Sequence, residues 1–208
     1  MLNEQGFDLW ADGYDRDVGL SEEADDYPFA GYRAVLGGVY AEVLLRGGGR
    51  VLDLGCGTAV LTARLYAAGC DVTAVDFSQN MLDIARRKMP GARLLRCGID
   101  EAPERLAGER FDAILSTYAL HHFADAEKRA LFARLRRLLR PGGVLCVGDV
   151  AFETRAQQDA CRDKAGDEWD GDEFYFAAED WRDVPGYAVR FDKKSHCAGV
   201  LTLTRGVE

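Results

Sequence analysis

Residues 51–59 read VLDLGCGTA, and residues 72–76 read VTAVD. The first stretch is an apolar strand that runs into a turn, where Gly55 and Gly57 allow positive φ angles and a close approach of the backbone to a ligand. The helix that follows starts with N–H groups that have no partner inside the helix. Asp76 ends the next strand, where a carboxylate can accept hydrogen bonds from both hydroxyls of a ribose. The two stretches therefore predict a nucleoside site on a doubly wound α/β sheet.

The loop also indicates which nucleoside is bound. A dinucleotide-binding loop follows the pattern G-x-G-x-x-G/A, in which the third small residue lets the helix pack closely while its N-terminus holds a pyrophosphate. Val60 stands at that third position. Asp53, just before the glycines, would repel a pyrophosphate but can help to hold an ammonium group. These features favour S-adenosylmethionine, whose methionine part carries an ammonium group.

With this loop the chain resembles the class I S-adenosylmethionine-dependent methyltransferases. Their first motif is D/E-x-G-x-G-x-G, and residues 53–59 match it except that Ala59 replaces the third glycine. Residues 111–116 (FDAILS) are similar to the fourth strand of the family, and residues 138–145 (LLRPGGVL) to its helix, turn and fifth strand. A narrower resemblance, to a subgroup of small bacterial methyltransferases, rests on Trp10-Ala11, Tyr14-Asp15, Glu127-Lys128 and the segment STYALHH at 116–122.

The resemblance implies which residues contact the cofactor. They are Asp53, Gly55, Cys56, Gly57, Asp76, Phe77, Met81, Ile99, Asp100 and Ser116. Tyr14 on the predicted lid is a further candidate: it either reaches the methionine carboxylate or the acceptor, or packs with Phe7 and Trp10. The family usually carries Gly-Asp after the third strand, whereas this chain has Gly98-Ile99-Asp100. The carboxylate is displaced by one residue, so we expect a backbone contact to the cofactor at Ile99.

Strand and helix patterns alternate along the chain, which is typical of a parallel sheet covered on both faces. Strands are predicted near 50–54, 71–75, 92–96, 110–115 and 143–148, and helices near 58–68, 79–89 and 125–140. Ser78 and Asp125 are candidate N-caps of the last two helices. The resemblance implies a final hairpin near 187–205 at the sheet edge. We therefore expect a Rossmann-like, doubly wound, seven-stranded sheet, mostly parallel with an antiparallel last strand.

Length and hydrophobic content predict one domain over residues 1–208, because 208 residues with 48% hydrophobic side chains are enough for a core. Residues 1–48 are predicted to form an N-terminal helical lid. Phe7, Trp10 and Tyr14 share one helical face there, and a second helix has apolar residues at spacings of three to four between 29 and 43. Residues 49–150 are the predicted cofactor-binding core, and residues 151–208 hold an insertion and the C-terminal strands.

The charge balance indicates the kind of partner. The chain has 26 basic and 35 acidic residues and a net charge of −9, which disfavours nucleic acid because a phosphate backbone needs a basic face. No long apolar run or signal peptide is recognisable, so we expect no membrane contact and a cytoplasmic location. The six cysteines form no C-x-x-C pair, and we therefore expect no metal site. The sequence does not indicate the oligomeric state.

His121 and His122 follow the fourth predicted strand, at the edge where ligands bind in open α/β sheets. They are the candidate catalytic residues, since histidine titrates near neutrality and can act as a general base. The alternative is that they only position the acceptor or cap the pocket, because methyl transfer from a sulfonium depends mainly on positioning. We favour positioning. Tyr118 either lines the acceptor site or packs in the core.

The acceptor class is indicated by a motif that the chain lacks. Methyltransferases that act on amino groups of DNA and some proteins carry N/D-P-P-Y after the fourth strand, whereas residues 116–119 read STYA. We therefore expect an S-adenosylmethionine-dependent methyltransferase that acts on a small molecule. One alternative is a catalytically silent cofactor-binding module that serves as a sensor or partner subunit. Another, a nicotinamide oxidoreductase on the same sheet, is disfavoured by Val60.

Overall fold

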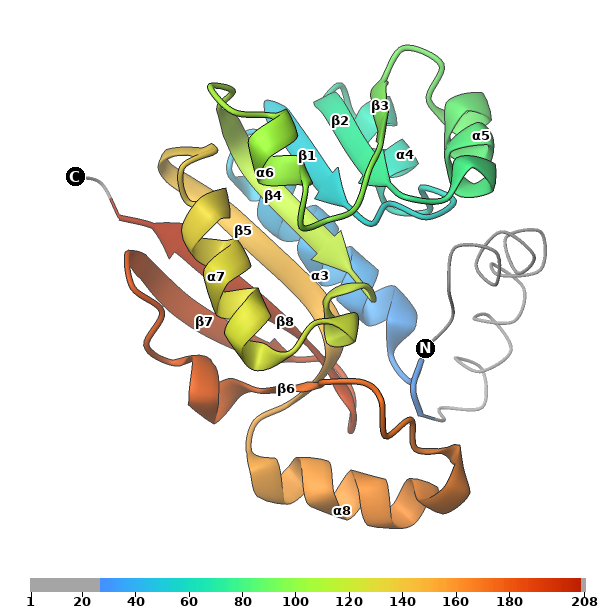
Figure 1. Ribbon diagram of the computed structural model, residues 1–208, viewed down its shortest axis with the longest axis vertical. Coiled ribbons are helices and arrows are strands. Elements are labelled where there is room, and N and C mark those ends of the chain that lie inside the picture. The colour runs from blue at the N-terminus through green and yellow to red at the C-terminus, as the bar shows by residue number, and fades with distance from the viewer. Residues whose placement is uncertain (1–26, 207–208) are drawn as a thin grey trace.

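The structure is a computed structural model and describes residues 27–206. Figure 1 shows a central sheet with helices on both faces. The strands are β1 (Arg50–Leu54), β2 (Asp71–Asp76), β3 (Arg93–Arg96), β4 (Phe111–Thr117), β5 (Leu139–Phe152), β6 (Phe176–Ala177), β7 (Tyr187–Lys193) and β8 (Ala198–Arg205). Seven of them lie in the order β3-β2-β1-β4-β5-β8-β7. The two-residue strand β6 pairs with the far end of β5 and was not predicted, because so short a segment has no periodicity.

The strand directions agree with the prediction. Strands β1 to β5 are all parallel, β8 is antiparallel to β5, and β7 is antiparallel to β8. The predicted Rossmann-like sheet, mostly parallel with an antiparallel last strand, is confirmed. Because β1, β2 and β4 are parallel, their carboxyl ends meet at one edge of the sheet (Figure 1).

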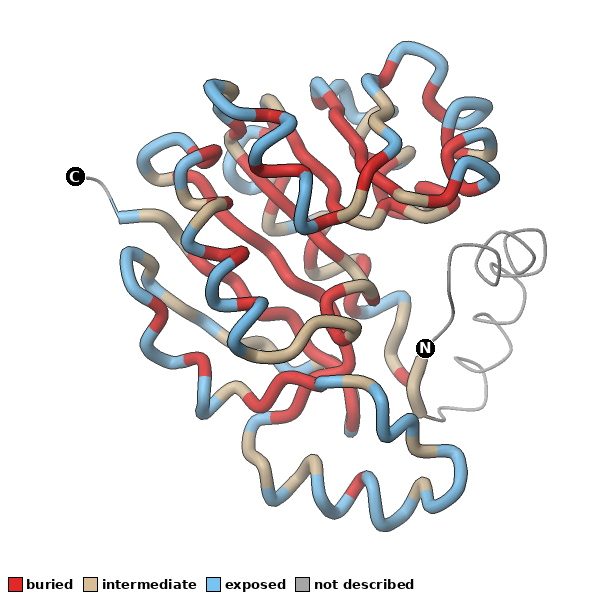
Figure 2. The backbone as a smooth tube through the Cα atoms, in the orientation of Figure 1, coloured by how far each residue is buried: buried red, intermediate tan, exposed pale blue. Residues whose placement is uncertain are grey.

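Helices cover both faces of the sheet. They are α3 (Tyr32–Leu45), α4 (Thr62–Ala67), α5 (Gln79–Lys88), α6 (Ala102–Arg105), α7 (Asp125–Leu135) and α8 (Arg155–Ala165), with 3-10 turns η1 (Leu120–His122), η2 (Gly166–Glu168) and η3 (Ala178–Trp181). Val51 packs in the core cluster that includes α3, α4 and α5, whereas Leu52 packs with α6 and α7. This alternation puts one core on each face, and Figure 2 shows the central strands between them, β1, β2, β4, β5 and β8, mostly buried. No helix within 27–206 is long and apolar enough to span a bilayer.

The start of one helix and the N-cap of another differ from the sequence prediction. Helix α4 begins at Thr62 and not near residue 58, because Ala59 has a φ of 63° and cannot belong to a right-handed helix. Ser78 caps α5 as predicted, since its hydroxyl accepts the N–H of Met81. The prediction for Asp125 is wrong. The N-cap of α7 is Ala124, whose N–H donates to the side chain of Glu127, and Asp125 pairs with Lys128 and Arg155 instead.

The N-terminal region is described from residue 27 onward. The predicted helix with apolar residues between 29 and 43 is confirmed as α3, which packs on β5 and β8 through Val35, Val39 and Val43. The other predicted helix of the expected lid, which carries Phe7, Trp10 and Tyr14, lies outside the described residues.

Candidate functional site

A cavity of about 300 Å³ opens at the carboxyl ends of β1, β2 and β4. This volume lies at the lower end of the range for small-ligand pockets, about 300–1,000 Å³. It is lined by Tyr32, Leu36, Asp53, Gly55, Cys56, Gly57, Thr58, Val60, Leu61, Thr62, Asp76, Phe77, Met81, Gly98, Ile99, Asp100, Thr117, Tyr118, Ala119, His122 and Phe123. The nucleoside site that the sequence predicts at this edge therefore coincides with a cavity.

The glycine loop forms one wall of the cavity. Gly55, Gly57 and Ala59 all have positive φ angles, at 74°, 52° and 63°, which turn the chain sharply between β1 and α4. A Cβ atom on Gly55 would lie 2.8 Å from Cβ of Ala119, so only glycine fits there. A Cβ on Gly57 would meet no atom of the described protein within 4 Å. Gly55 is thus required for packing, whereas the backbone of Gly57 borders open space.

Asp76 joins the end of β2 to this loop. It is 6% exposed, and its Oδ2 accepts the N–H of Gly57 at 2.8 Å. Its Oδ1 accepts the N–H of Ser78 at 2.9 Å. These backbone donors fix the carboxylate at the cavity wall, where the sequence predicts a ribose-binding group.

Asp53 is a buried carboxylate in the same wall. It is 2% exposed, and its Oδ2 accepts a short hydrogen bond from the hydroxyl of Thr62. Its Oδ1 has no hydrogen-bond partner within residues 27–206. Burial is the main cause that raises the pKa of Asp53 to about 7; the hydrogen bond from Thr62 opposes the rise, and the nearby charge of Asp76 adds to it. A buried carboxylate oxygen that lacks a donor fits an ammonium group in the cavity.

Most of the predicted cofactor residues lie together in this wall. Those that line the cavity are Asp53, Gly55, Cys56, Gly57, Asp76, Phe77, Met81, Ile99 and Asp100. Ser116 does not line it, because successive strand residues point to opposite faces and its hydroxyl donates to the carbonyl of Leu54 at 2.8 Å. Its neighbour Thr117 lines the cavity instead. Tyr14 lies outside the described residues.

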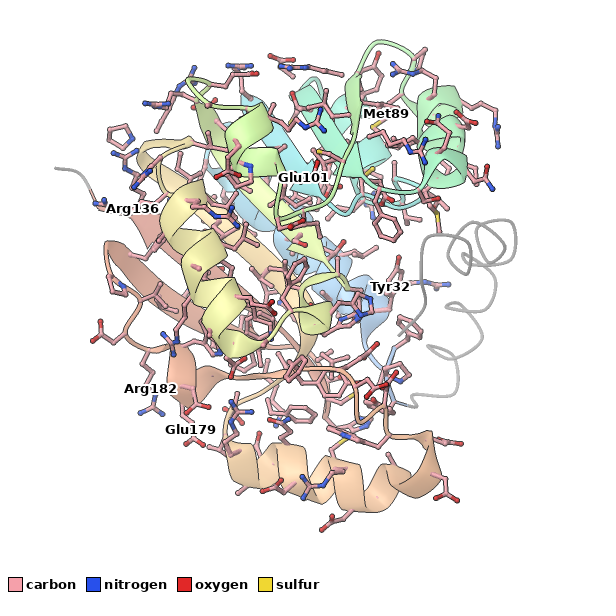
Figure 3. The ribbon with its side chains drawn as sticks, in the orientation of Figure 1. Tyr32, Met89, Glu101, Arg136, Glu179 and Arg182 are labelled. Carbon is pink, nitrogen blue, oxygen red and sulfur yellow. The ribbon has the colours of Figure 1, made fainter. Side chains whose placement is uncertain are left out.

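Part of the cavity wall is aromatic. It includes Tyr32 and Leu36 of α3, and Tyr118 and Phe123 on either side of η1. Figure 3 places Tyr32 on α3 beside the carboxyl end of β4, and its ring centroid is 5.2 Å from that of Tyr118. Neither Tyr32 nor Leu36 was assigned to the site from the sequence, because the helix that carries them was predicted only as part of the lid.

The two histidines occupy different positions. His122 lines the cavity, whereas His121 lies behind it and is 8% exposed. Nδ1 of His121 lies 2.6 Å from Oδ1 of Asp149 on β5, and its Nε2 lies 3.5 Å from Oε1 of Glu173. Nδ1 of His122 lies 3.8 Å from the same oxygen of Glu173. Neither carboxylate was predicted from the sequence, since neither lies near the histidines in the chain.

The surroundings set opposite pKa shifts in the two imidazoles. Burial disfavours the charged form of His121, but the carboxylates of Asp149 and Glu173 together outweigh burial, so the pKa of His121 is raised. Burial and the neighbouring His121 lower the pKa of His122 to about 4. His122 is therefore neutral near pH 7 and a weak base, which favours positioning over proton removal at the cavity wall.

Comparison with known proteins identifies the family. The family described as "Methyltransferase domain" matches residues 51–143. An uncharacterised methyltransferase of Geobacillus kaustophilus is 37% identical over 150 residues, which are 72% of this chain and 67% of that protein.

Two solved structures share the fold. A magnesium protoporphyrin IX methyltransferase from Synechocystis PCC 6803 with bound SAH has a TM-score of 0.67 at 20% identity and covers 86% of this chain and 85% of its own. The complex of the protein DhpI with SAH has a TM-score of 0.68 at 20% identity and covers 99% of this chain and 96% of its own.

Fold, cavity and relatives define the same class. The chain belongs to the class I S-adenosylmethionine-dependent methyltransferases.

Proposed function

We propose that this methyltransferase acts on a small molecule, which lies against the aromatic part of the cavity wall. The observation that carries the proposal is that these aromatic side chains, the glycine loop and the two carboxylates all line one cavity of about 300 Å³. Asp76 would hold the ribose, Asp53 the ammonium group and the backbone of Gly57 the methionine part of the cofactor. The acceptor would then lie against Tyr32, Tyr118 and His122.

When bound, the cofactor supplies a methyl group on a sulfonium, which is already activated for transfer. The protein then has to hold the acceptor in line with the methyl group and to exclude water. The aromatic rings in the cavity wall supply apolar surface for both tasks. The neutral imidazole of His122 can orient a polar group of the acceptor without taking a proton from it.

Charge near the site supports a small acceptor over nucleic acid. Residues 166–173 read GDEWDGDE, with five acidic side chains and no basic one, and Glu173 of this stretch lies next to both histidines. Such a border repels a polyanion. The magnesium protoporphyrin IX methyltransferase with the same fold is named for a small acceptor, which agrees with the proposal.

Methyl transfer into a cell extract tests the proposal, because the extract offers many acceptors at once. The protein is incubated with methyl-labelled S-adenosylmethionine and with dialysable or retained fractions of the extract. We expect label in compounds of the dialysable fraction, and none above background with the Asp76→Ala variant. Label that appears only in retained protein or nucleic acid would contradict a small-molecule acceptor.

A further inference from the structure

We propose that His121, His122 and Glu173 form a binding site for one divalent transition-metal ion at the border of the cavity. One ligand atom from each of these residues lies within 4.8 Å of the other two. Both histidines come from η1, and Glu173 comes from the insertion between α8 and β6. The sequence prediction of no metal site rested on the absence of cysteine pairs. That criterion does not detect a site made of two imidazoles and one carboxylate.

The spacing of the ligand atoms suits a metal ion better than direct hydrogen bonds. Oε1 of Glu173 lies 3.5 Å from Nε2 of His121 and 3.8 Å from Nδ1 of His122. Both distances exceed those of a good N–H···O bond, about 2.7–3.2 Å. Zinc bonds of about 2.0–2.2 Å in tetrahedral geometry put ligand atoms roughly 3.4 Å apart. The carboxylate oxygen is therefore already close to the spacing that one ion requires from each imidazole nitrogen, and the two nitrogens lie within 4.8 Å of each other.

Two of the ligands already have the outer partners typical of metal sites. Asp149 lies 2.6 Å from Nδ1 of His121, which turns Nε2 toward Glu173. The hydroxyl of Tyr175 donates to Oε2 of Glu173 at 2.6 Å, which leaves Oε1 for the site. Carboxylate–histidine pairs of this kind fix the tautomer and the ring orientation of metal-bound histidines.

The insertion is held against η1 in the position that the site requires. The N–H of Phe174, next to Glu173, donates to the carbonyl of His121 at 2.7 Å. The carbonyl of Phe174 accepts a hydrogen bond from the ammonium of the buried Lys128 side chain. Glu173 is therefore fixed beside the histidines by the backbone that follows it.

The local charge also favours a cation. The charged groups that act on His121 within the described residues are the carboxylates of Asp149 and Glu173 and the ammonium of Lys128. The ammonium of Lys128 already pairs with Asp125. The cluster therefore carries surplus negative charge, which a divalent ion would neutralise.

The donor set indicates which ions bind and what they would do. Two imidazoles and a carboxylate suit Zn²⁺, Fe²⁺, Co²⁺ or Ni²⁺ and leave at least one coordination position open. Because His122 also lines the cavity, the ion would lie beside the acceptor. A hydroxyl group of the acceptor is the ligand that such an ion would take, and this last step rests on the proposed function.

Titration of the metal-free protein with Co²⁺, followed by the visible spectrum, and with Zn²⁺, followed by calorimetry, tests the site. We expect one ion per chain and a cobalt spectrum without thiolate charge transfer, since all six cysteines would stay free. His122→Asn and Glu173→Gln should each raise the Kd at least tenfold. Asp149→Asn should raise it about 10- to 100-fold by loosening His121. The matched controls, His196→Asn and the exposed Glu168→Gln, should bind like the unmodified protein.

Three results would overturn the site. They are no binding to the unmodified protein, a thiolate–cobalt band, or an affinity in His122→Asn and Glu173→Gln equal to that of the unmodified protein. The first two results are obtained with the unmodified protein, so the proposal can be refuted even if a substitution unfolds the chain. The titration contains neither cofactor nor acceptor. A failed metal site is therefore distinguishable from a failed small-molecule acceptor, which the labelling experiment tests alone.

Discussion

Oδ2 of Asp76 and the backbone nitrogen of Gly57 are 2.8 Å apart, and this hydrogen bond joins the end of β2 to the loop after β1. The two elements of the nucleoside site thus hold each other in place before any ligand binds. A carboxylate can accept about four hydrogen bonds, so the loop and a ribose can share Asp76. The contact makes the site preorganised, which lowers the cost of ordering it on binding.

We expect Asp76→Ala to weaken the binding of S-adenosylhomocysteine by about 1–3 kcal/mol, because charge-assisted hydrogen bonds to the ribose are lost. That loss is roughly a 5- to 150-fold rise in Kd by calorimetry. Asp71→Ala is the control, since Asp71 begins the same strand and its side chain is 72% exposed. Equal affinity in the Asp76 variant would remove Asp76 from the site.

Gly55→Ala should destabilise the fold more than Gly108→Ala, although both glycines have a positive φ. Gly108 also has a positive φ, 91°, but a Cβ there meets no described atom within 4 Å. Gly108→Ala should therefore cost about 1–2 kcal/mol for the left-handed backbone alone. Gly55→Ala should cost about 1–3 kcal/mol more, because its Cβ would lie 2.8 Å from Cβ of Ala119. Urea unfolding of both variants measures the difference, and equal losses would refute the steric argument.

The sequence was sufficient for the sheet and for the cofactor end of the site, because both depend on local signals. Apolar runs alternate with helical patterns, and Gly55, Gly57 and Asp76 lie at strand ends that parallel pairing brings to one edge. Ser116 shows the limit of this reasoning. One step along a strand reverses the direction of the side chain, so Thr117 and not Ser116 faces the cavity.

The aromatic part of the cavity wall and the surroundings of His121 depend on long-range contacts that no local sequence pattern indicates. Tyr32 reaches the site because α3 crosses the sheet beside β4, β5 and β8. Asp149 and Glu173 reach His121 from a neighbouring strand and from the insertion. The sequence signal that could have found Glu173 is the concentration of acids and aromatics at 166–176, but that signal does not specify a partner.

Lys128→Met should destabilise the protein by about 1–3 kcal/mol, because the hydrogen bond from a charged donor to the carbonyl of Phe174 is lost. The Lys128 side chain is fully buried, and its ammonium also lies 4.2 Å from the ring centroid of Phe176. Methionine keeps the apolar contacts but cannot donate. Lys164→Met, at an exposed position of α8, is the control for loss of a lysine charge. Urea unfolding that gives the same free energy for both variants would show that the buried contact contributes nothing.

The raised pKa of Asp53 predicts how stability changes with pH. The group's ordinary value is 3.8, and burial, opposed by Thr62 and aided by Asp76, raises its pKa to about 7 in the folded protein. The folded state then holds the proton more tightly than the unfolded state, so this group's contribution to stability falls as pH rises from 3.8 through about 7. Asp53→Asn should remove that fall. The free energy of urea unfolding, measured against pH for both proteins, should diverge across this range, and parallel curves would show that Asp53 is not perturbed.

The same group should make cofactor binding depend on pH in the opposite direction. An ammonium group in the cavity attracts the ionised form of Asp53, so binding below the pKa of about 7 must release its proton. The affinity for S-adenosylhomocysteine should therefore rise as pH increases through 7, and calorimetry in buffers of different ionisation enthalpy should detect the released proton. Methylthioadenosine has the same nucleoside but no ammonium group, and its affinity should not rise. Asp53→Asn should abolish the rise for S-adenosylhomocysteine. If the affinities of both ligands for the unmodified protein change with pH in the same way, Asp53 does not hold the ammonium group. Oδ1 of Asp53, which has no hydrogen-bond partner within residues 27–206, would then have another role.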